Sequence, residues 1–253
     1  MNEYLKNLNK IEFVVTDACT GRCKHCSQGE HSMSGSHIDA RLAAEAVKRI
    51  AAEYAIDTVM TFGGEPLLYP EAVCLIMSTA TKLNIPRRQV ITNGYFSKDP
   101  DRIREVAEIL SKSGVNDLLL SVDAFHEETI PIDTVRAFAE ELKRFGVPVR
   151  LQPAWLVSAE ADNAYNAGTR EILESFADLG FAVSEGNVVF PEGNAAKYLA
   201  EYFVMYAPQN PYEEDPTDVR CVSFAANGDV LDSNFYTRDI MEIIENYDPT
   251  KTV

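Results

Sequence analysis

Short apolar runs alternate with amphipathic segments along most of the chain. Six runs are typical of strands because they are short and β-prone, and segments of helical periodicity lie between them. The predicted strands cover residues 11–16, 58–62, 89–92, 117–122, 148–155 and 182–190. The clearest helical stripes are Ala43, Val47, Ile50, Ala51 and Tyr54, then Ile103, Val106, Ala107 and Leu110, then Val135, Phe138, Ala139 and Leu142, then Ile172, Leu173, Phe176 and Leu179.

Glycines close three of the predicted helices. Gly114, Gly146 and Gly180 stand where a left-handed cap is expected, and a β-prone run follows each within a few residues. The strand–helix unit is thus repeated about six times, which implies a parallel sheet with right-handed crossovers. Six units suit an open barrel better than a closed eight-stranded one, so the predicted fold is α/β, a partial (βα)6 barrel.

After about residue 191 the pattern changes. The later segments predict a helix over 191–203, a proline-rich acidic connection over 206–218, a hairpin about Asn227–Gly228 within 220–233, and a closing helix over 238–247. We expect a barrel domain over 1–205 and a short C-terminal extension over 206–253 that is too short to fold alone.

Composition narrows the class of protein. Of 253 residues, 46% are apolar and 25% are charged, which is the range of globular proteins with a sizeable core. The start MNEYLKNLNK is not an apolar leader and no apolar run has the length of a membrane span, so we expect a soluble, cytoplasmic protein without membrane contact. The net charge of −16 disfavours a nucleic-acid partner; it fits solubility alone or a cationic peptide or protein partner.

Three of the five cysteines lie within eight residues. Cys19, Cys23 and Cys26 have the spacing C-x3-C-x2-C directly after the first predicted strand. A structural zinc site takes four ligands, whereas a [4Fe–4S] cluster on three cysteines leaves one iron for a ligand that is not protein. Two alternatives stay open here, an iron–sulfur cluster or a zinc or copper loop completed by a histidine. The candidate histidines are His25, His31 and His37.

Other polar residues also follow predicted strands. Gly63-Gly64-Glu65-Pro66 follow the second strand, Asn93-Gly94 follow the third, and Ser121, Asp123 and His126 lie at the end of the fourth. The carboxyl ends of parallel strands meet on one face of such a barrel, where sites are built. The sequence therefore predicts that these groups meet the cysteines at one rim.

The cysteine triplet and the Gly-Gly-Glu-Pro segment, in this order and separated by one helix, resemble the two marks of the radical S-adenosylmethionine (SAM) superfamily. The resemblance covers roughly residues 10–190. It implies a [4Fe–4S] cluster on Cys19, Cys23 and Cys26 whose fourth iron is chelated by the methionyl part of SAM. It also implies reductive cleavage of SAM to a 5′-deoxyadenosyl radical that takes a hydrogen from the substrate. A reductant such as flavodoxin or ferredoxin and an oxygen-sensitive, anaerobic reaction follow from it.

The resemblance further implies SAM contacts for eight residues. They are His25 at the usually aromatic position of the triplet, Gly63, Gly64 and Glu65 near the SAM amino group, Thr92 and Asn93 near the adenosine end, and Ser121 and Asp123 near the ribose or carboxylate. Judged from residue types alone, Gly-Gly-Glu-Pro and Asn-Gly are also common turns, and His126 is also typical of a solvated loop. Asp123 and His126 are the candidate catalytic side chains beyond the cluster. Gln152 and Trp155 are candidates to line the site from the fifth strand.

The C-terminal extension departs from the peptide-modifying relatives. Residues 220–233 resemble the start of their SPASM or twitch extension, but Asp232 and Ser233 stand where those relatives place another cysteine. Cys221 alone cannot hold an auxiliary cluster. We expect a peptide or protein substrate first, a small molecule such as a nucleoside or cofactor precursor second, and activation of a glycyl-radical enzyme third. A non-catalytic iron–sulfur or zinc redox sensor is the alternative from another class.

Overall fold

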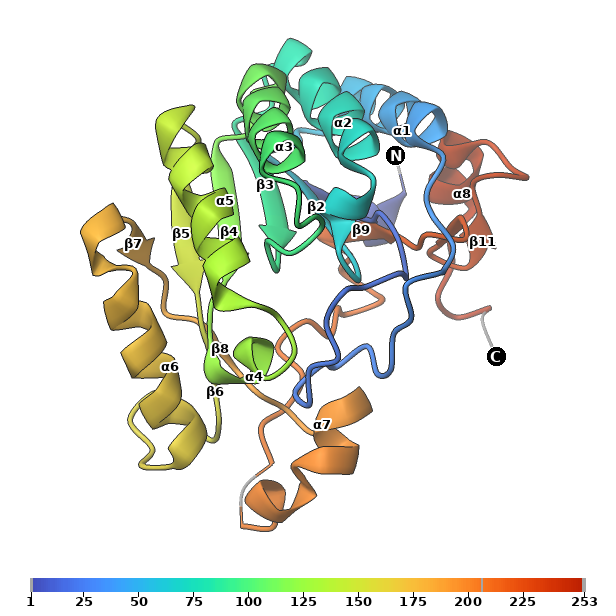
Figure 1. Cartoon of the computed structure of the whole chain (residues 1–253). Coiled ribbons are helices and arrows are strands. Elements are labelled where there is room, and N and C mark those ends of the chain that lie inside the picture. The colour runs from blue at the N-terminus through green and yellow to red at the C-terminus, as the bar shows by residue number, and fades with distance from the viewer. Residues whose placement is uncertain (1, 206, 252–253) are drawn as a thin grey trace.

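The computed structural model describes residues 2–205 and 207–251 (Figure 1). Residues 1, 206 and 252–253, which include the predicted start of the C-terminal extension, lie outside them. Within the described ranges the main sheet has the strand order β11–β10–β9–β1–β2–β3–β4–β5–β7. Its strands are Lys10–Val14 (β1), Thr58–Phe62 (β2), Arg87–Thr92 (β3), Asp117–Ser121 (β4), Val149–Gln152 (β5), Ala182–Val183 (β7), Cys221–Phe224 (β9), Asp229–Val230 (β10) and Ser233–Asn234 (β11).

The sheet is parallel from β9 through β7, and it does not close. Each neighbouring pair from β1 to β5 is parallel, and so are β5–β7 and β1–β9. The ends of the sheet are β11 and β7, which do not pair with each other. The predicted α/β fold with an open, partial barrel is therefore confirmed.

The larger helices pack on one face of this sheet (Figure 1). Their apolar stripes meet alternate strand residues such as Phe13, Val59 and Leu118 in one core. Asp39 caps the start of α1, because its carboxylate accepts from the N–H groups of Arg41 and Leu42. The helices are Ala40–Glu53 (α1), Pro70–Lys82 (α2), Pro100–Ser113 (α3), Ala124–Glu127 (α4), Ile132–Arg144 (α5), Ala164–Ser175 (α6), Gly193–Tyr198 (α7) and Ile240–Asn246 (α8), with 3-10 turns at Glu3–Leu5 (η1), Pro66–Leu68 (η2), Ala177–Leu179 (η3) and Ala200–Phe203 (η4).

Two of the predicted strands are wrong as continuous elements. Residues 148–155 divide into β5 and β6 (Ala154–Trp155) because Pro153 has no N–H to continue the ladder. Residues 182–190 divide into β7 and β8 (Asn187–Val188), with Gly186 between them at φ +79°. β6 and β8 pair with each other in a separate two-stranded sheet. The sixth strand of the barrel is consequently only two residues long.

The C-terminal segment belongs to the same sheet as the barrel. β9 lies parallel to β1, with Lys10 opposite Cys221 and Phe13 opposite Phe224. The rings of Phe13 and Phe224 stack with their centroids 4.7 Å apart. The hairpin expected about Asn227–Gly228 is present between β9 and β10. The helix expected over 191–203 is α7 followed by η4, and the expected closing helix is α8.

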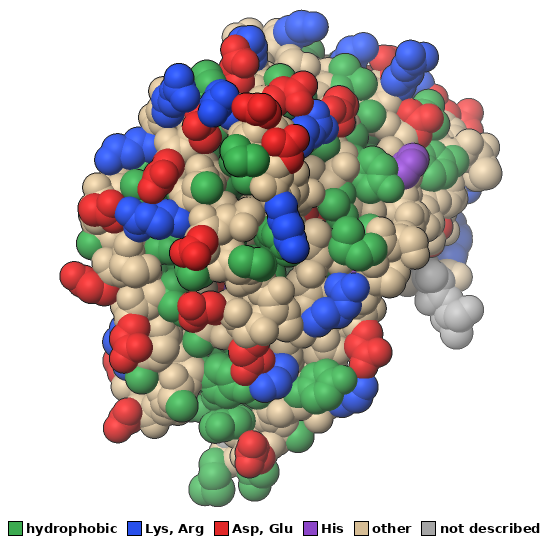
Figure 2. Space-filling model, viewed as in Figure 1, with side chains coloured by type: hydrophobic (Ala, Val, Ile, Leu, Met, Phe, Trp, Pro, Cys, Tyr) green, Lys and Arg blue, Asp and Glu red, His purple; other side chains and the backbone are tan. Residues whose placement is uncertain are grey.

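The surface carries both signs of charge. Figure 2 shows acidic and basic side chains interspersed over the helices, so on this face the net charge of −16 is not gathered into one acidic patch. None of the helices in the described ranges combines the length and the apolar content that a bilayer crossing needs.

The face of the sheet that these helices leave uncovered is called the open face below. On β4 the side chains of Leu118 and Leu120 join the core under the helices. Because successive strand residues point to opposite faces, Asp117, Leu119 and Ser121 lie on the open face.

A buried band lies in the middle of the open face on β2, β3 and β4, whereas Glu12 on β1 and Arg150 on β5 are partly exposed. It consists of Met60, Gln89 and Leu119 from three adjacent strands, each at most 9% exposed. Partly exposed side chains lie on both sides of it: Phe62, Ile91 and Ser121 toward the carboxyl ends of the strands, and Lys10, Thr58 and Asp117 toward the amino ends. The open face therefore presents two separate accessible ends.

Candidate functional site

The cysteine triplet lies in the segment that joins β1 to α1, at the carboxyl ends of the strands (Figure 1). Cys19 and Cys23 are buried, Cys26 is half-buried, and all three are free thiols. Burial raises the pKa of the Cys19 thiol to about 11 and also raises the pKa of Cys23. Ionised thiolates here need a nearby positive charge, which is what bound iron or zinc supplies.

Two side chains approach the sulfurs of the triplet. Asn93 Nδ2 lies 3.6 Å from Cys19 Sγ, and His31 Nε2 lies 3.4 Å from Cys26 Sγ. His31 Nδ1 lies 2.8 Å from the carbonyl oxygen of Asp17, which can only accept, so Nδ1 carries the proton in the neutral ring. The Cys26 thiol then donates to Nε2.

The two glycines after β2 let the cysteine segment lie directly against them. Gly64 N donates to Thr16 O and Glu65 N donates to Ala18 O, both at 2.8 Å. A Cβ atom on Gly64 would lie 2.2 Å from Ala18 O, and one on Gly63 would lie 2.6 Å from Thr16 O. The backbone at these positions is bare, as expected, and the group that approaches it in this structure is the chain's own cysteine segment.

Glu65 is a fully buried carboxylate that ties three elements together. Its Oε1 accepts from Leu67 N at 2.9 Å and from Thr92 Oγ1 at 2.7 Å, and its Oε2 accepts from Asn93 N at 2.9 Å. Burial raises the pKa of Glu65 to about 7, although these hydrogen bonds act in the opposite direction. A second lone pair on Oε2 remains for one further donor, such as an ammonium group.

Asn93 connects the end of β3 to the cysteine segment. Besides its contact to Cys19, its Nδ2 donates to Thr20 Oγ1 at 3.2 Å, and its Oδ1 accepts from Tyr95 N at 2.8 Å. The side chain is buried. Asn93, at the end of β3, thus holds the cysteine segment through Thr20, although the two residues are far apart in the sequence.

Asp123 holds His126 at the end of β4. Its Oδ1 accepts from the N–H groups of Phe125 and His126 at 3.0 Å, and its Oδ2 lies 2.8 Å from His126 Nδ1 and accepts from Ala154 N at 3.2 Å. Burial opposes ionisation of Asp123, but His126 outweighs it and the pKa of this carboxyl lies below its ordinary value. Both oxygens of Asp123 are therefore occupied, whereas the second ring nitrogen of His126 has no hydrogen-bond partner among the described residues.

His25 and His126 lie next to Cys23. One ligand atom from each of the three lies within 4.8 Å of the others. His25 also packs on Phe125, with ring centroids 4.8 Å apart. Burial lowers the pKa of His25 to about 4, and within the described residues its buried Nδ1 has no hydrogen-bond partner. A bound molecule at this point could supply that partner.

Asn194 is a residue of this site that the sequence did not reveal. Its Nδ2 donates to Cys23 O at 3.0 Å and its backbone N–H donates to Cys26 O at 2.9 Å. It comes from α7, about 170 residues after the triplet, and only its place at the start of a predicted helix singled it out. Asn194 fixes the main chain of two of the three cysteines.

Two of the three further candidates lie apart from the triplet, and the third, Gln152, lies at the same end of the sheet. Cys221 stands opposite Lys10 at the amino end of β1, whereas the triplet follows its carboxyl end. Trp155 belongs to the separate β6–β8 sheet and donates from its ring nitrogen to Glu185 O at 2.9 Å. Gln152 pairs with Ser121 in the β4–β5 register, so it reaches the carboxyl end of the open face.

The three histidines considered for a zinc or copper loop lie in different places. His25 is beside Cys23, His31 is beside Cys26, and His37 packs its ring on Tyr69 with centroids 4.6 Å apart. This arrangement does not favour one histidine completing a four-ligand site with all three cysteines. Three thiols on one loop, with the buried Nδ1 of His25 left for a bound molecule, fit a [4Fe–4S] cluster with SAM.

Comparison with curated proteins identifies relatives that act on a small molecule. A GTP 3′,8-cyclase of Desulforamulus reducens is 29% identical over 132 residues, which are 51% of this chain and 38% of the cyclase. A GTP 3′,8-cyclase of Vibrio parahaemolyticus is 28% identical over 127 residues, 47% of this chain and 36% of that protein. The match thus spans well under half the length of these relatives.

Solved structures share the fold over nearly the whole chain. SuiB of Streptococcus suis bound to its precursor peptide SuiA matches 97% of this chain and 66% of its own, with a TM-score of 0.64 and 14% identity. BtrN in complex with AdoMet and 2-DOIA matches 94% of this chain and 82% of its own, with a TM-score of 0.51 and 16% identity. At these identities the likeness is one of fold.

The family match rests on the region that holds the site. Residues 13–153 match the model of the radical SAM superfamily. They include the cysteine triplet, the Gly-Gly-Glu segment, Asn93 and the Asp123–His126 pair, and they make up more than half of the chain. This chain belongs to the radical SAM superfamily.

Proposed function

We propose that this protein cleaves SAM reductively at a [4Fe–4S] cluster on Cys19, Cys23 and Cys26 and directs the 5′-deoxyadenosyl radical to a peptide or protein substrate. Family membership implies the cluster and SAM. The observation that carries the assignment of ligands is the loop itself, where three free thiols are clamped from two sides. Gly64 and Asn194 hold its main chain through hydrogen bonds. A reductant such as flavodoxin or ferredoxin supplies the electron.

The surrounding side chains have distinct tasks in this proposal. Asn93 points an N–H group at Cys19 Sγ, which favours the thiolate. Glu65 keeps Asn93 in place and has one acceptor position left for the SAM amino group. His25 offers a buried ring nitrogen to SAM, and His126, positioned by Asp123, faces the same space. Ser121 and Thr92 complete the proposed SAM contacts.

A large substrate is supported by the exposed carboxyl end of the open face. Phe62, Ile91 and Ser121 remain half-buried there instead of being packed into a closed barrel interior. The structure of SuiB with a precursor peptide shows that a protein of this fold binds such a substrate. A peptide or protein segment is therefore our first choice.

A small molecule is the second candidate. It is supported by the GTP 3′,8-cyclases, one of which matches about half of this chain at 29% identity. A nucleotide substrate would lie on the same end of the open face.

Anaerobic reconstitution tests the proposed reaction. The wild-type chain should bind about four irons and, once reduced, convert SAM to 5′-deoxyadenosine. Cys19→Ala should lose both properties. Cys74→Ala is the control, because Cys74 is also a free thiol but lies half-buried on α2, and its loss should leave both properties unchanged. One tightly bound zinc with no SAM cleavage would contradict the proposal.

The substrate class is tested by the yield of 5′-deoxyadenosine. A precursor peptide encoded beside this gene should raise the yield above the uncoupled level and lose hydrogen at one residue by mass spectrometry. GTP is the parallel probe for the second candidate. Stimulation by GTP and not by the peptide would overturn our first choice.

A further inference from the structure

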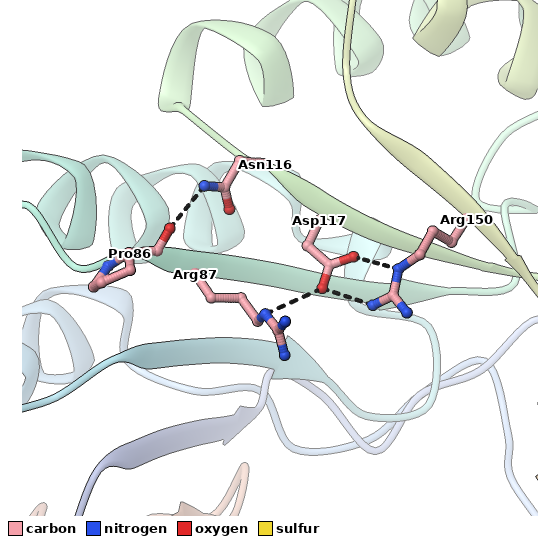
Figure 3. Close-up of a pocket in the computed structure, with 5 residues that line it drawn as sticks. All are labelled: Pro86, Arg87, Asn116, Asp117 and Arg150. Carbon is pink, nitrogen blue, oxygen red and sulfur yellow. Dashed lines mark hydrogen bonds and ion pairs between the residues drawn. The ribbon is translucent and has the colours of Figure 1, made fainter. Parts of the chain in front are cut away.

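A second polar site lies at the opposite end of the open face. Figure 3 shows it at the amino ends of β3, β4 and β5. A cavity of about 200 Å³ is lined there by Pro86, Arg87, Asn116, Asp117 and Arg150. Nothing in the proposed SAM reaction uses these residues.

One carboxylate in this cavity faces two guanidinium groups. Arg150 donates to Asp117 from Nε at 2.9 Å and from Nη2 at 2.8 Å. Arg87 Nε lies on the other side of the same carboxylate at 3.6 Å (Figure 3). Gln89 Nε2 adds a further hydrogen bond to Asp117 at 2.7 Å. The cluster thus has an excess of one positive charge.

Several donors of this cluster have no partner. Within the described ranges, both Nη atoms of Arg87 and the Nη1 atom of Arg150 lack a hydrogen bond or ion pair. The side chain of Arg87 is 60% exposed and that of Arg150 is 39% exposed, while Asp117 is 12% exposed. Arg150 neutralises the charge of Asp117, and Arg150 and Gln89 together supply hydrogen bonds to both of its carboxylate oxygens. Arg87 is therefore not needed to stabilise this carboxylate.

The open donors match one class of ligand. Guanidinium groups bind the paired oxygens of carboxylates and phosphates through parallel N–H donors. A single oxyanion between Arg87 and Arg150 would neutralise the excess charge and fill the free donor positions.

We propose that Arg87 and Arg150 form a binding site for an oxyanion, a carboxylate or phosphate group, at the amino ends of β3 to β5. The buried side chains of Met60 and Leu119 lie between it and the carboxyl end of the open face, where the SAM site is proposed. On β4, four residue steps separate Asp117 at one end from Ser121 at the other, a span of about 13 Å at the rise of a strand. The site does not depend on the reaction proposed above.

Calorimetric titration of the full chain with inorganic pyrophosphate and with glutarate, in the absence of SAM, tests this site. Arg87→Gln leaves Arg150 to pair with Asp117, and we expect it to weaken binding of the anion about tenfold. Asp117→Asn removes the competing carboxylate and should strengthen binding about threefold. Arg41→Gln is the matched control, since it removes the same charge from an exposed position on α1 and should change the affinity less than twofold.

The two probes distinguish the sources of the anion. Binding of pyrophosphate alone identifies a phosphate-bearing ligand, and binding of glutarate alone identifies a carboxylate, as on an acidic peptide. The proposal is overturned if neither probe binds, or if Arg87→Gln and Arg41→Gln weaken binding equally. Thermal melting confirms that each variant is folded; if Arg87→Gln does not fold, Arg87→Lys should give an intermediate loss because it keeps the charge without the fork.

A repeat titration with SAM present should give the same affinity, because the two sites are separate. The calorimetric readout involves no SAM cleavage, so loss of anion binding and loss of the radical reaction are distinguishable. A protein that binds pyrophosphate but makes no 5′-deoxyadenosine would refute only the reaction.

Discussion

The two ends of the open face are built in different ways. At the carboxyl ends, Glu65, Asn93 and Asp123 are buried and each is fixed by hydrogen bonds to main-chain N–H groups. At the amino ends, Arg87 and Arg150 are partly exposed and are held by one carboxylate. A change at the first end must therefore move backbone, whereas a change at the second alters mainly charge. Cofactor chemistry needs the first kind of construction, because a cluster ligand displaced by an ångström no longer binds.

Removal of the C-terminal segment should disrupt both ends of the open face, because β9 covers the edge of β1 from Lys10 to Phe13. Deleting residues 206–253 removes the buried Val222 and Phe224 and leaves Phe13 without its stacked partner. We expect a loss of more than about 5 kcal/mol in unfolding free energy, enough to abolish a cooperative urea transition. The division into domains 1–205 and 206–253 remains a proposal, and a truncated chain that unfolds cooperatively would support an independent barrel.

Gly64→Ala should disrupt only the carboxyl end of the open face, where the cysteine segment lies. The added Cβ would lie 2.2 Å from Ala18 O, so the cysteine segment must move. We expect a loss of about 3 kcal/mol and less than one iron per chain after reconstitution. Gly146→Ala is the control: it has φ +69° but no neighbour within 4 Å of the added Cβ, so it should cost about 1 kcal/mol and keep the iron. Equal iron loss in both variants would refute the packing argument.

The buried Glu65 should make the stability of the carboxyl end depend on pH. Its pKa in the folded protein is about 7, above its ordinary value of 4.5, so the folded state holds the proton more tightly. The contribution of Glu65 to the free energy of unfolding is therefore greatest below pH 4.5. It falls by up to about 3 kcal/mol as the pH rises from 4.5 to 7. Urea unfolding of the metal-free protein across this range should show the fall, and Glu65→Gln should flatten it. An unchanged slope in Glu65→Gln would assign the effect to other groups.

Asn194→Ala tests whether α7 positions the triplet. It removes the hydrogen bond to Cys23 O from a buried side chain, and we expect a cost of about 1–2 kcal/mol with a lower affinity for iron. Asn246→Ala, which changes an exposed asparagine on α8, is the control. If chelator competition shows the same iron affinity in both variants, Asn194 has only a structural role.

Arg87→Gln should have the smallest effect on stability. The pair with Asp117 is long and the arginine is mostly exposed, so the unfolding free energy should change by less than about 0.5 kcal/mol. Urea denaturation measures it. A loss above about 2 kcal/mol would mean that the amino end is held as rigidly as the carboxyl end.

The sequence was most informative where local chemistry decides the outcome. The spacing of Cys19, Cys23 and Cys26 and the two glycines after β2 identify the rim residues, because parallel strands deliver them to one edge. Pro153 shows the limit of periodicity, since one missing N–H ends β5 inside an apolar run that reads as one strand.

Contacts between residues far apart in the chain could not be predicted from the sequence. Asn194 reaches Cys23 from about 170 residues away, and no local pattern marks an asparagine as a clamp on a distant carbonyl. The Arg87–Asp117–Arg150 cluster was missed for the same reason, because its members come from three strands and each alone looks like a surface charge. Parallel pairing brings them together only when the register is known.

The position of β9 beside β1 has a consequence for biosynthesis. The first strand leaves the ribosome early, but the neighbour that completes its ladder is made about 210 residues later, roughly 10–40 s at ordinary elongation rates. Until then the strand that leads into the cysteine loop is an exposed edge, open to wrong partners. The sheet that supports the cysteine loop is therefore complete only after synthesis of residue 224, later than the strands of the barrel itself.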